Sequence, residues 1–253
     1  MTDFVNQLDK LTNARSVEEL WDIHTTQMGG YGFDRLMYGF TRYRTSSSLG
    51  DPQDWVLLST QSPEYMRMFF DEGYYYHAPM LNWALANDGA CSWRWMMDMN
   101  RIDNLTPSEK RVMEFNRQMD VTAGYTISFR SISERTKAAI ALTAKAGISQ
   151  DAVEQTWAKH GDEIIVMNNV MHLKLLTLPY SGERHLTKRQ REVLQWVGDG
   201  KTTQDIALLL GLTSATVEKH LRLAREALDV ETTAQAVLKA AFYNQMFIMD
   251  VEV

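Results

Sequence analysis

The sequence predicts an α+β protein, in which an N-terminal α/β/α sandwich with an antiparallel sheet precedes an all-α, four-helix domain of the helix-turn-helix type. The chain of 253 residues has room for two domains of ordinary size. Residues 177–185 contain Pro179 and Gly182, which interrupt a long helical pattern and indicate a linker. Strand-like and helix-like segments are mixed before this linker, whereas helical periodicity dominates after it. We therefore expect a first domain over residues 1–176 and a second over residues 186–253.

Capping signals and hydrophobic periodicity predict the elements of the first domain. Ser16 and Glu19 form a capping box at the start of a helix that Gly29 ends. Thr106 followed by Pro107 marks a second helix start, because proline is favoured at the first helical position. Further helices are expected over residues 63–74 and 149–176, and strands over residues 36–42, 54–60, 92–96, 123–130 and 138–143. The last helix is expected to bury Val153, Trp157, Ile164, Val166, Val170 and Leu173.

The second domain carries three helix starts at short intervals. Capping boxes begin at Thr187 and Thr202, and a further helix starts after a glycine turn at Gly211. Two short helices joined by such a turn form a helix-turn-helix, whose second helix enters the major groove of DNA. In that second helix the polar positions are Ser214, Thr216, Glu218, Lys219, Arg222 and Arg225, and the apolar stripe is Val217, Leu221, Ala224 and Leu228.

The second domain resembles the LuxR-type helix-turn-helix domain throughout its length. The matching residues are Leu186-Thr187, Arg189, Glu192-Val193-Leu194, Trp196, Gly200-Lys201-Thr202, Ile206-Ala207, Leu210, Thr216-Val217, His220, Ala224, Leu228 and Ala236-Val237. Gln190 departs from the usual glutamate but can still close its capping box, and Thr232-Thr233 depart from Asn-Arg but can still cap the last helix. With the resemblance, the expected DNA-binding residues are Lys201, Thr202, Gln204, Ser214, Thr216, Lys219, His220, Arg222 and Arg225.

The charge distribution limits how this domain can bind DNA. The chain has a net charge of −6, and residues 181–230 hold eight Lys and Arg against seven Asp and Glu. Because the DNA-binding domain is nearly neutral, its binding to DNA must depend on a few well-placed cations and not on a broad basic surface. We therefore expect modest non-specific affinity and a weak dependence on salt.

Aromatic residues concentrate in the middle of the first domain and indicate a ligand cavity. The cluster contains Trp55, Tyr65, Phe69, Phe70, Tyr74, Tyr75, Tyr76, Trp83, Trp93 and Trp95. Each of these residues alone is better explained as core packing. Together they favour a cavity, because tyrosine and tryptophan supply polar groups that a plain core does not need.

The first domain is similar, at low identity, to the autoinducer-binding domain of acyl-homoserine-lactone receptors. The similarity is carried by Gly73-Tyr74, Pro79, Trp93 and Gly124. Ala78 stands where the family has an aspartate that accepts the ligand's amide N–H, and Tyr65 where a tryptophan donates to the lactone carbonyl. The expected ligand-binding residues are Tyr38, Trp55, Tyr65, Phe69, Tyr75, Ala78, Trp93, Tyr125 and Ala141. A buried amide N–H facing Ala78 would be unpaired and would cost about 1–3 kcal/mol, so the usual ligand is in question while the pocket is not.

These observations predict a homodimeric, DNA-binding transcription regulator whose first domain binds a small, partly apolar effector, either an acyl-homoserine lactone or another molecule. The alternative is a regulator that needs no ligand, or one that inhibits a related receptor by forming heterodimers. The expected partners are a palindromic double-stranded DNA operator, a second copy of the chain and the effector, with RNA polymerase as a further candidate. The last helix offers an apolar surface for pairing at Val237, Leu238, Ala241, Phe242, Met246 and Ile248.

Composition and motif spacing argue against other classes. The chain lacks a long apolar run and a signal-peptide pattern, and Cys91 is its single cysteine, so we expect a cytoplasmic protein without a membrane partner. The six histidines lack metal-ligand spacing, and no nucleophile motif is present. Gly200-Lys201-Thr202 resembles the end of a phosphate-binding loop, but Gln195 replaces the required first glycine. We therefore expect no catalytic residues, no cofactor and no metal.

Overall fold

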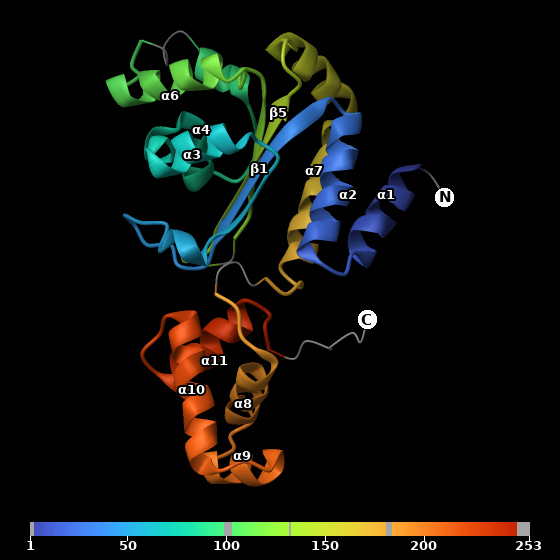
Figure 1. Cartoon of the computed structure of the whole chain (residues 1–253). Coiled ribbons are helices and arrows are strands. Elements are labelled where there is room, and N and C mark those ends of the chain that lie inside the picture. The colour runs from blue at the N-terminus through green and yellow to red at the C-terminus, as the bar shows by residue number, and fades with distance from the viewer. Residues whose placement is uncertain (1–2, 99–102, 132, 181–183, 247–253) are drawn as a thin grey trace. The chain divides into compact units, whose positions relative to one another are not determined.

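The structure is a computed structural model that describes residues 3–98, 103–131, 133–180 and 184–246 (Figure 1). The chain is divided into two compact units, Met1–Leu176 and Thr177–Val253. No helix in the described part of the chain is long and apolar enough to cross a membrane.

A five-stranded antiparallel sheet forms the centre of the first unit. Its strands are β1 (Phe33–Thr41), β2 (Val56–Ser59), β3 (Gly89–Ser92), β4 (Gly124–Phe129) and β5 (Lys137–Ala144), in the order β2-β1-β5-β4-β3. The expected strand over residues 92–96 is wrong. The Ser92 hydroxyl accepts a hydrogen bond from the backbone N–H of Arg94, which turns the chain into the short helix η3 (Trp93–Met97) after β3 has ended.

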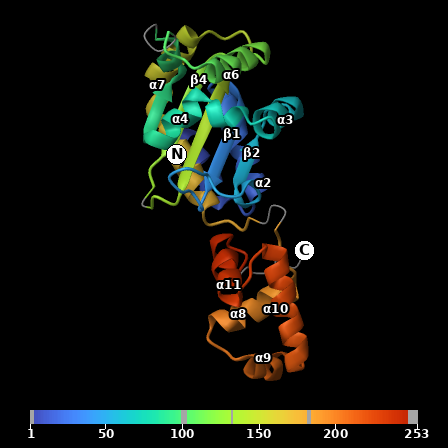
Figure 2. The same cartoon turned by 90° about the vertical axis from the view of Figure 1, so that its left-hand side faces the viewer.

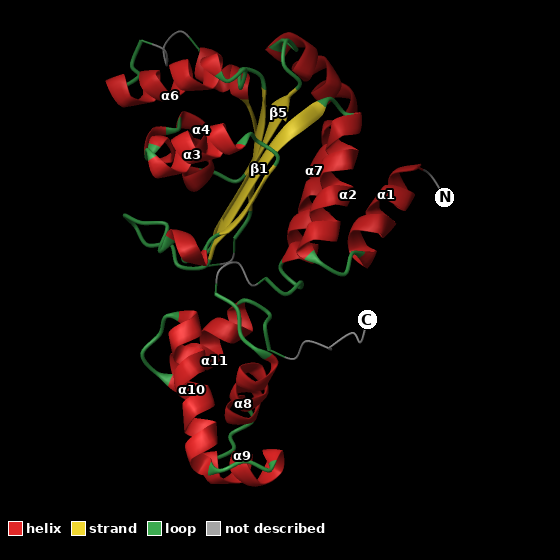
Figure 3. Ribbon diagram, viewed as in Figure 1, coloured by secondary structure: helices red, strands yellow, loops and turns green. Residues whose placement is uncertain are grey.

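Helices cover both faces of this sheet, which confirms the predicted α/β/α sandwich (Figures 1 and 3). One face carries α1 (Asp3–Asn13), α2 (Val17–Gly30) and α7 (Gln150–Leu175). The opposite face carries α3 (Pro63–Asp71), α4 (Pro79–Ala86) and α6 (Pro107–Gln118), with the short helices η1 (Pro52–Asp54) and η2 (Tyr74–His77) nearby. Figure 2 shows α3, α4 and α6 in front of the strands.

Local capping explains most of the helix boundaries. α6 begins at the predicted start, where the Thr106 hydroxyl accepts from the backbone N–H of Glu109 and the Glu109 carboxylate accepts from the backbone N–H of Thr106. The capping box predicted at Ser16 is only half formed, because the Ser16 hydroxyl accepts from the backbone N–H of Glu19 but the Glu19 carboxylate accepts from that of Arg15. The helix expected over residues 63–74 is shorter. Gly73 has a φ of 75°, a left-handed conformation that favours glycine, and it separates α3 from η2.

The buried stripe of α7 differs from the predicted one. Val153 and Ile164 are buried as expected, but Val166 is 41% exposed and Leu173 is 62% exposed. Polar residues occupy part of the inner face instead, namely Asn168, which bonds His24, and His172, which bonds Tyr38. The pattern of apolar residues predicted the wrong buried stripe, because Asn168 and His172 are polar and yet buried. Hydrogen-bond partners on neighbouring elements make their burial possible.

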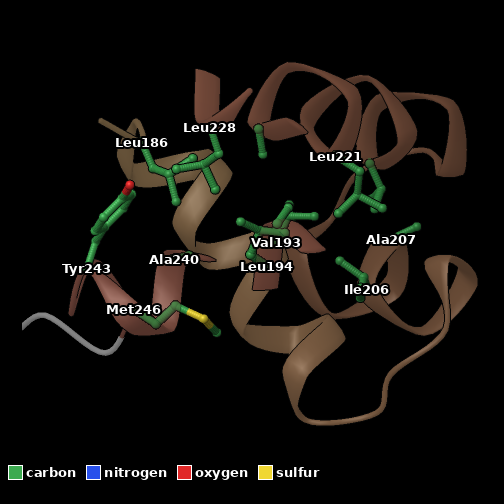
Figure 4. Packing of buried hydrophobic residues seen from close by; sticks show 13 residues of the cluster. Leu186, Val193, Leu194, Ile206, Ala207, Leu221, Leu228, Ala240, Tyr243 and Met246 are labelled. Atoms are coloured by element: carbon green, nitrogen blue, oxygen red, sulfur yellow. The ribbon is translucent and has the colours of Figure 1, made fainter. Parts of the chain in front are cut away.

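The second unit is all-helical, as predicted, and contains α8 (Lys188–Gly198), α9 (Thr203–Leu210), α10 (Ser214–Leu228) and α11 (Thr233–Phe242). Gly211 has a φ of 63° and ends α9 at the tight turn before α10. Figure 4 shows the apolar core between these helices. Its buried residues include Val193, Leu194, Ile206, Val217, Leu221, Leu228 and Ala240.

The described part of the predicted linker is bound to the second unit. Gln245 accepts from the backbone N–H of Leu186 at 2.9 Å and donates to the carbonyl oxygen of Arg184 at 2.7 Å. Its amide also donates to the carbonyl oxygen of Tyr180 at 3.2 Å, and Gln245 is only 3% exposed. One buried amide therefore holds the entry segment of the helical unit.

Candidate ligand cavity and DNA-reading surface

A cavity of about 150 Å³ lies between the sheet and the helices α3 and α4. Its floor comes from alternate residues of two neighbouring strands, Met37 and Gly39 of β1 and Ala139 and Ala141 of β5. Successive side chains of a strand point to opposite faces, so the side chain of Tyr38, between Met37 and Gly39, points to the other face of the sheet. The small side chains at Gly39, Ala139 and Ala141 leave room above the sheet.

Packed aromatic rings form the wall of the cavity. Tyr65 stacks on Phe69 with ring centroids 5.4 Å apart, and Trp55 meets Tyr75 edge-on at 5.6 Å. The indole N–H of Trp55 donates to the carbonyl oxygen of Leu49, another lining residue, at 2.8 Å, so this ring is held in place by the backbone. The aromatic cluster thus shapes a cavity instead of filling the whole core.

The polar groups of the wall are paired with other protein groups. The Tyr65 hydroxyl donates to Oδ1 of Asn116 at 3.0 Å, and the indole N–H of Trp93 donates to the hydroxyl of Thr126 at 2.9 Å. Burial raises the pKa of Tyr65, so its hydroxyl stays protonated and can serve as a donor. A ligand that takes either donor must replace one of these hydrogen bonds.

Seven of the nine residues expected to bind a ligand line this cavity: Trp55, Tyr65, Phe69, Tyr75, Ala78, Trp93 and Ala141. The expectation is wrong for Tyr38 and Tyr125. Tyr38 bonds His172 of α7, and Tyr125 stacks on Trp157 of α7 with ring centroids 3.7 Å apart. Both tyrosines point to the other face of the sheet, because their strand neighbours Met37 and Thr126 take the cavity side.

Six polar lining residues were not predicted: Thr41, Gln61, Asn116, Thr126, Lys137 and Thr143. Two of them had a usable signal. Lys137 and Thr143 are an even number of residues from Ala141, so strand alternation puts all three on one face. Asn116 lies on α6, far from the other residues in sequence, and only the tertiary fold brings it to Tyr65.

Ala78 lies at the start of α4, where a helix N-terminus meets the cavity. It is the N-cap residue of α4 and is 6% exposed, and its methyl group supplies no capping hydrogen bond. The cavity therefore has no acidic acceptor at this position.

The expected DNA-binding residues form a surface on α9 and α10 of the second unit. Lys201, Thr202 and Gln204 are exposed at the start of α9, and Ser214, Lys219 and Arg222 are exposed along α10. Thr216, His220 and Arg225 are half-buried. The hydroxyl of Thr203 donates to Glu218 at 2.9 Å, so the start of α9 lies beside the middle of α10.

Two arginines of α10 already have protein partners. Arg222 forms an ion pair with Glu226 one turn further along, and both side chains are more than half exposed. Arg225 donates to the hydroxyl of Thr233 at 2.9 Å. Lys219 is exposed on the same helix face as Arg222, three residues before it.

Two family models match the chain, and together they span most of it. Residues 16–175 match the autoinducer binding domain, and residues 184–240 match the luxR family of bacterial regulatory proteins. These ranges contain the cavity and the helical surface described above.

Individual relatives agree with these matches. The transcriptional activator protein ExpR of Dickeya dadantii is 24% identical over 74% of this chain and 76% of its own length. SdiA, a protein of Escherichia coli, has been solved in complex with octanoyl-rac-glycerol, and that structure is 17% identical over 96% of each chain with a TM-score of 0.50. The N-acylhomoserine lactone dependent factor CepR2 from Burkholderia cenocepacia is 13% identical over 68% of this chain and 93% of its own, with a TM-score of 0.53. At these identities the two structures support the fold alone.

Proposed function

This chain belongs to the LuxR family of bacterial transcription regulators with an autoinducer-binding domain, and we propose that it is a cytoplasmic homodimer whose DNA binding is controlled by a small, partly apolar effector. The family consists of DNA-binding regulators and not of enzymes. In this proposal residues 1–176 sense the effector, residues 177–185 link the domains, and residues 186–253 read DNA.

The observation that carries the proposal is the aromatic-walled cavity above a floor of small residues. An apolar cavity with a few polar groups is the usual form of a small-molecule site. Ala78 supplies no acceptor for an amide N–H, which favours an acyl compound without an amide. The similar folds differ in their ligands, because SdiA has been solved with octanoyl-rac-glycerol, an ester without an amide N–H, whereas CepR2 depends on an N-acylhomoserine lactone.

DNA reading requires two copies in this proposal. One recognition helix covers only a few base pairs, so a two-fold dimer on a palindromic operator is the expected arrangement. Exposed apolar side chains are available for pairing, with Leu238 of α11 55% exposed and Leu173 of α7 62% exposed. The proposed DNA contacts are the α9 and α10 residues described above, and RNA polymerase is a further proposed partner.

One observation favours a second candidate, a regulator that needs no effector or inhibits a relative through heterodimers. The hydrogen bonds from Tyr65 to Asn116 and from Trp93 to Thr126 satisfy these two aromatic side chains without any ligand. The cavity of about 150 Å³ is also smaller than the roughly 300–1,000 Å³ of ordinary ligand sites.

Native mass spectrometry of the full chain purified from its source cells separates the two candidates, because it reports subunit number and bound ligand together. The proposal predicts a dimer that carries a small apolar molecule, and loss of operator affinity when that molecule is removed. A ligand-free dimer with full operator affinity would favour the second candidate.

A further inference from the structure

Lys137 is the one charged residue among the cavity-lining residues that the structure describes. It is the first residue of β5, and it pairs with Thr41 of β1 in the antiparallel register. Alternation along β5 places it on the same face as Ala139 and Ala141, which form the cavity floor. Lys137 is 8% exposed, so this side chain is largely shielded from solvent.

The ammonium group of Lys137 has two protein partners. Nζ donates to the carbonyl oxygen of Asn87 and to Oδ1 of Asp88, both at 2.9 Å. An ammonium group has three N–H donors, so one donor has no partner among the described residues. A cation that is largely shielded from solvent and has an incomplete set of partners gains from a further oxygen ligand.

The balance of charge in the cavity also favours a negative ligand. Asp88 is the acidic partner of Lys137, but its side chain is 47% exposed, whereas that of Lys137 is 9% exposed. Solvent therefore screens the carboxylate more than the ammonium. No described lining residue is acidic, and the position at the start of α4 holds Ala78.

The floor provides a path for an acyl chain that leads away from this cation. Ala139 and Ala141 follow Lys137 on the same face, and Thr143 lies at the far end. Lys137 and Thr143 are six residue steps apart along β5, which corresponds to about 20 Å. A ligand with its head group at Lys137 would lie across two alanines and against the aromatic wall.

We propose that Lys137 binds a carboxylate and that the effector is a free fatty acid or a closely similar acyl carboxylate. This inference rests on the proposed effector-binding function and specifies the class of effector. The alternative is that Lys137 has only a structural role, in which its bond to Asp88 attaches β5 to the segment after α4. In that case its removal would lower stability without changing which ligand the cavity prefers.

The test compares ligands that differ only at the head group. The full chain is titrated calorimetrically with dodecanoate below its micelle concentration, and with dodecanol and methyl dodecanoate below their solubility limits. We expect wild type to bind dodecanoate about ten- to a hundredfold more tightly than either neutral ligand, as for a charge-assisted hydrogen bond. Lys137→Met should abolish this preference while still binding dodecanol. Lys145→Met is the matched control, because Lys145 is exposed just beyond β5 and should leave the preference intact.

Three results would overturn the assignment. Equal affinity of wild type for the acid and the alcohol would do so, and this comparison needs no variant that might fail to fold. A preference for the acid that survives in both Lys137→Met and Lys137→Gln would place the carboxylate elsewhere. If none of the three ligands binds, the proposed effector-binding function falls as well, whereas binding of the neutral ligands alone would leave that function standing.

Discussion

The hydroxyl oxygen of Tyr38 lies 2.8 Å from Nδ1 of His172, and this hydrogen bond joins strand β1 to α7 on the face of the sheet opposite the ligand cavity. His172 also stacks on Phe129 of β4, with ring centroids 4.3 Å apart. Asn168, also on α7, forms a hydrogen bond with His24 of α2. The face of the sheet that lacks the cavity is therefore fixed by buried polar pairs.

Tyr38→Phe should lower the free energy of unfolding by about 1–3 kcal/mol, because it leaves a buried histidine nitrogen without its partner. Ligand affinity should be unchanged, since Tyr38 faces away from the cavity. Urea unfolding and ligand titration measure the two quantities separately. Tyr65→Phe is the matched control, because Tyr65 lies in the cavity wall. A change of ligand affinity in Tyr38→Phe that equals the change in Tyr65→Phe would contradict this arrangement.

Stability should fall on mild acidification because of the two buried histidines. Burial lowers the pKa of His24 and of His172 to about 4, from an ordinary value of 6.5. Below about pH 6.5 the unfolded chain therefore binds protons that the native chain does not bind, down to about pH 4. Each histidine should contribute a fall of up to about 1.4 kcal/mol per pH unit within this window and nothing above it.

Urea unfolding at about pH 7 and about pH 5.5 checks this prediction, because carboxylates titrate mainly below that range. His172→Gln should reduce the difference between the two conditions. His160→Gln serves as the control, because His160 is a half-buried residue of α7 that bonds Glu163 of the same helix. An equal pH dependence in wild type and His172→Gln would refute the role of His172.

Gln245→Ala should destabilise the helical unit. Its side chain accepts from the backbone N–H of Leu186 and donates to the carbonyl oxygens of Arg184 and Tyr180. Removing it leaves buried backbone groups unpaired, at about 1–3 kcal/mol for each group that water cannot reach. Thermal unfolding should show a lower midpoint for Gln245→Ala than for wild type. Gln235→Ala is the comparison, because the exposed Gln235 side chain only caps α11. Equal losses in both variants would argue against this role.

Local signals in the sequence predicted the parts of the fold that depend on a few neighbouring residues. The predicted capping boxes at Thr187 and Thr202 are present, because a cap needs only residues three positions apart. The turn at Gly211 was predictable for the same reason. These signals fixed the helix starts of the second unit and its helix-turn-helix.

The cavity was harder to predict, because its lining depends on which face of each strand the helices cover. Tyr38 and Met37 are neighbours, and only the tertiary arrangement decides that Met37 faces the cavity. The buried stripe of α7 was predicted wrongly because the polar residue Asn168 is buried. Its hydrogen-bond partner, His24, is 144 residues away in sequence. Such pairings carry no local signal.

Arg222→Ala should weaken operator binding by about 1–3 kcal/mol and relax base preference at one position, if its guanidinium reads a base. Arg222 is paired with Glu226 in the free protein, so binding must exchange that ion pair for a DNA contact. Glu226→Gln should therefore bind DNA at least as tightly as wild type, because it frees the arginine. Fluorescence anisotropy with operator DNA measures both variants. Unchanged binding by Arg222→Ala would remove this residue from the reading surface.

Ala78→Asp should create affinity for acyl-homoserine lactones. Ala78 is the N-cap of α4 and makes no side-chain capping bond, so an aspartate there can accept from free backbone N–H groups of the first turn. That pairing reduces the cost of burying a carboxylate, and it holds the acid at the cavity edge where a ligand amide can reach it. The aspartate should also repel a ligand carboxylate.

We therefore expect Ala78→Asp to bind dodecanoyl-homoserine lactone about ten- to a hundredfold more tightly than wild type does, and to bind octanoyl-rac-glycerol no better. Ala78→Ser is the control, because serine caps the helix without adding a charge. Thermal melts give the readout, since a ligand at a hundred times its dissociation constant adds about 2.7 kcal/mol of stability. A large shift of wild type with the lactone would contradict the prediction, because it would mean that the cavity recognises the amide without an acid at position 78.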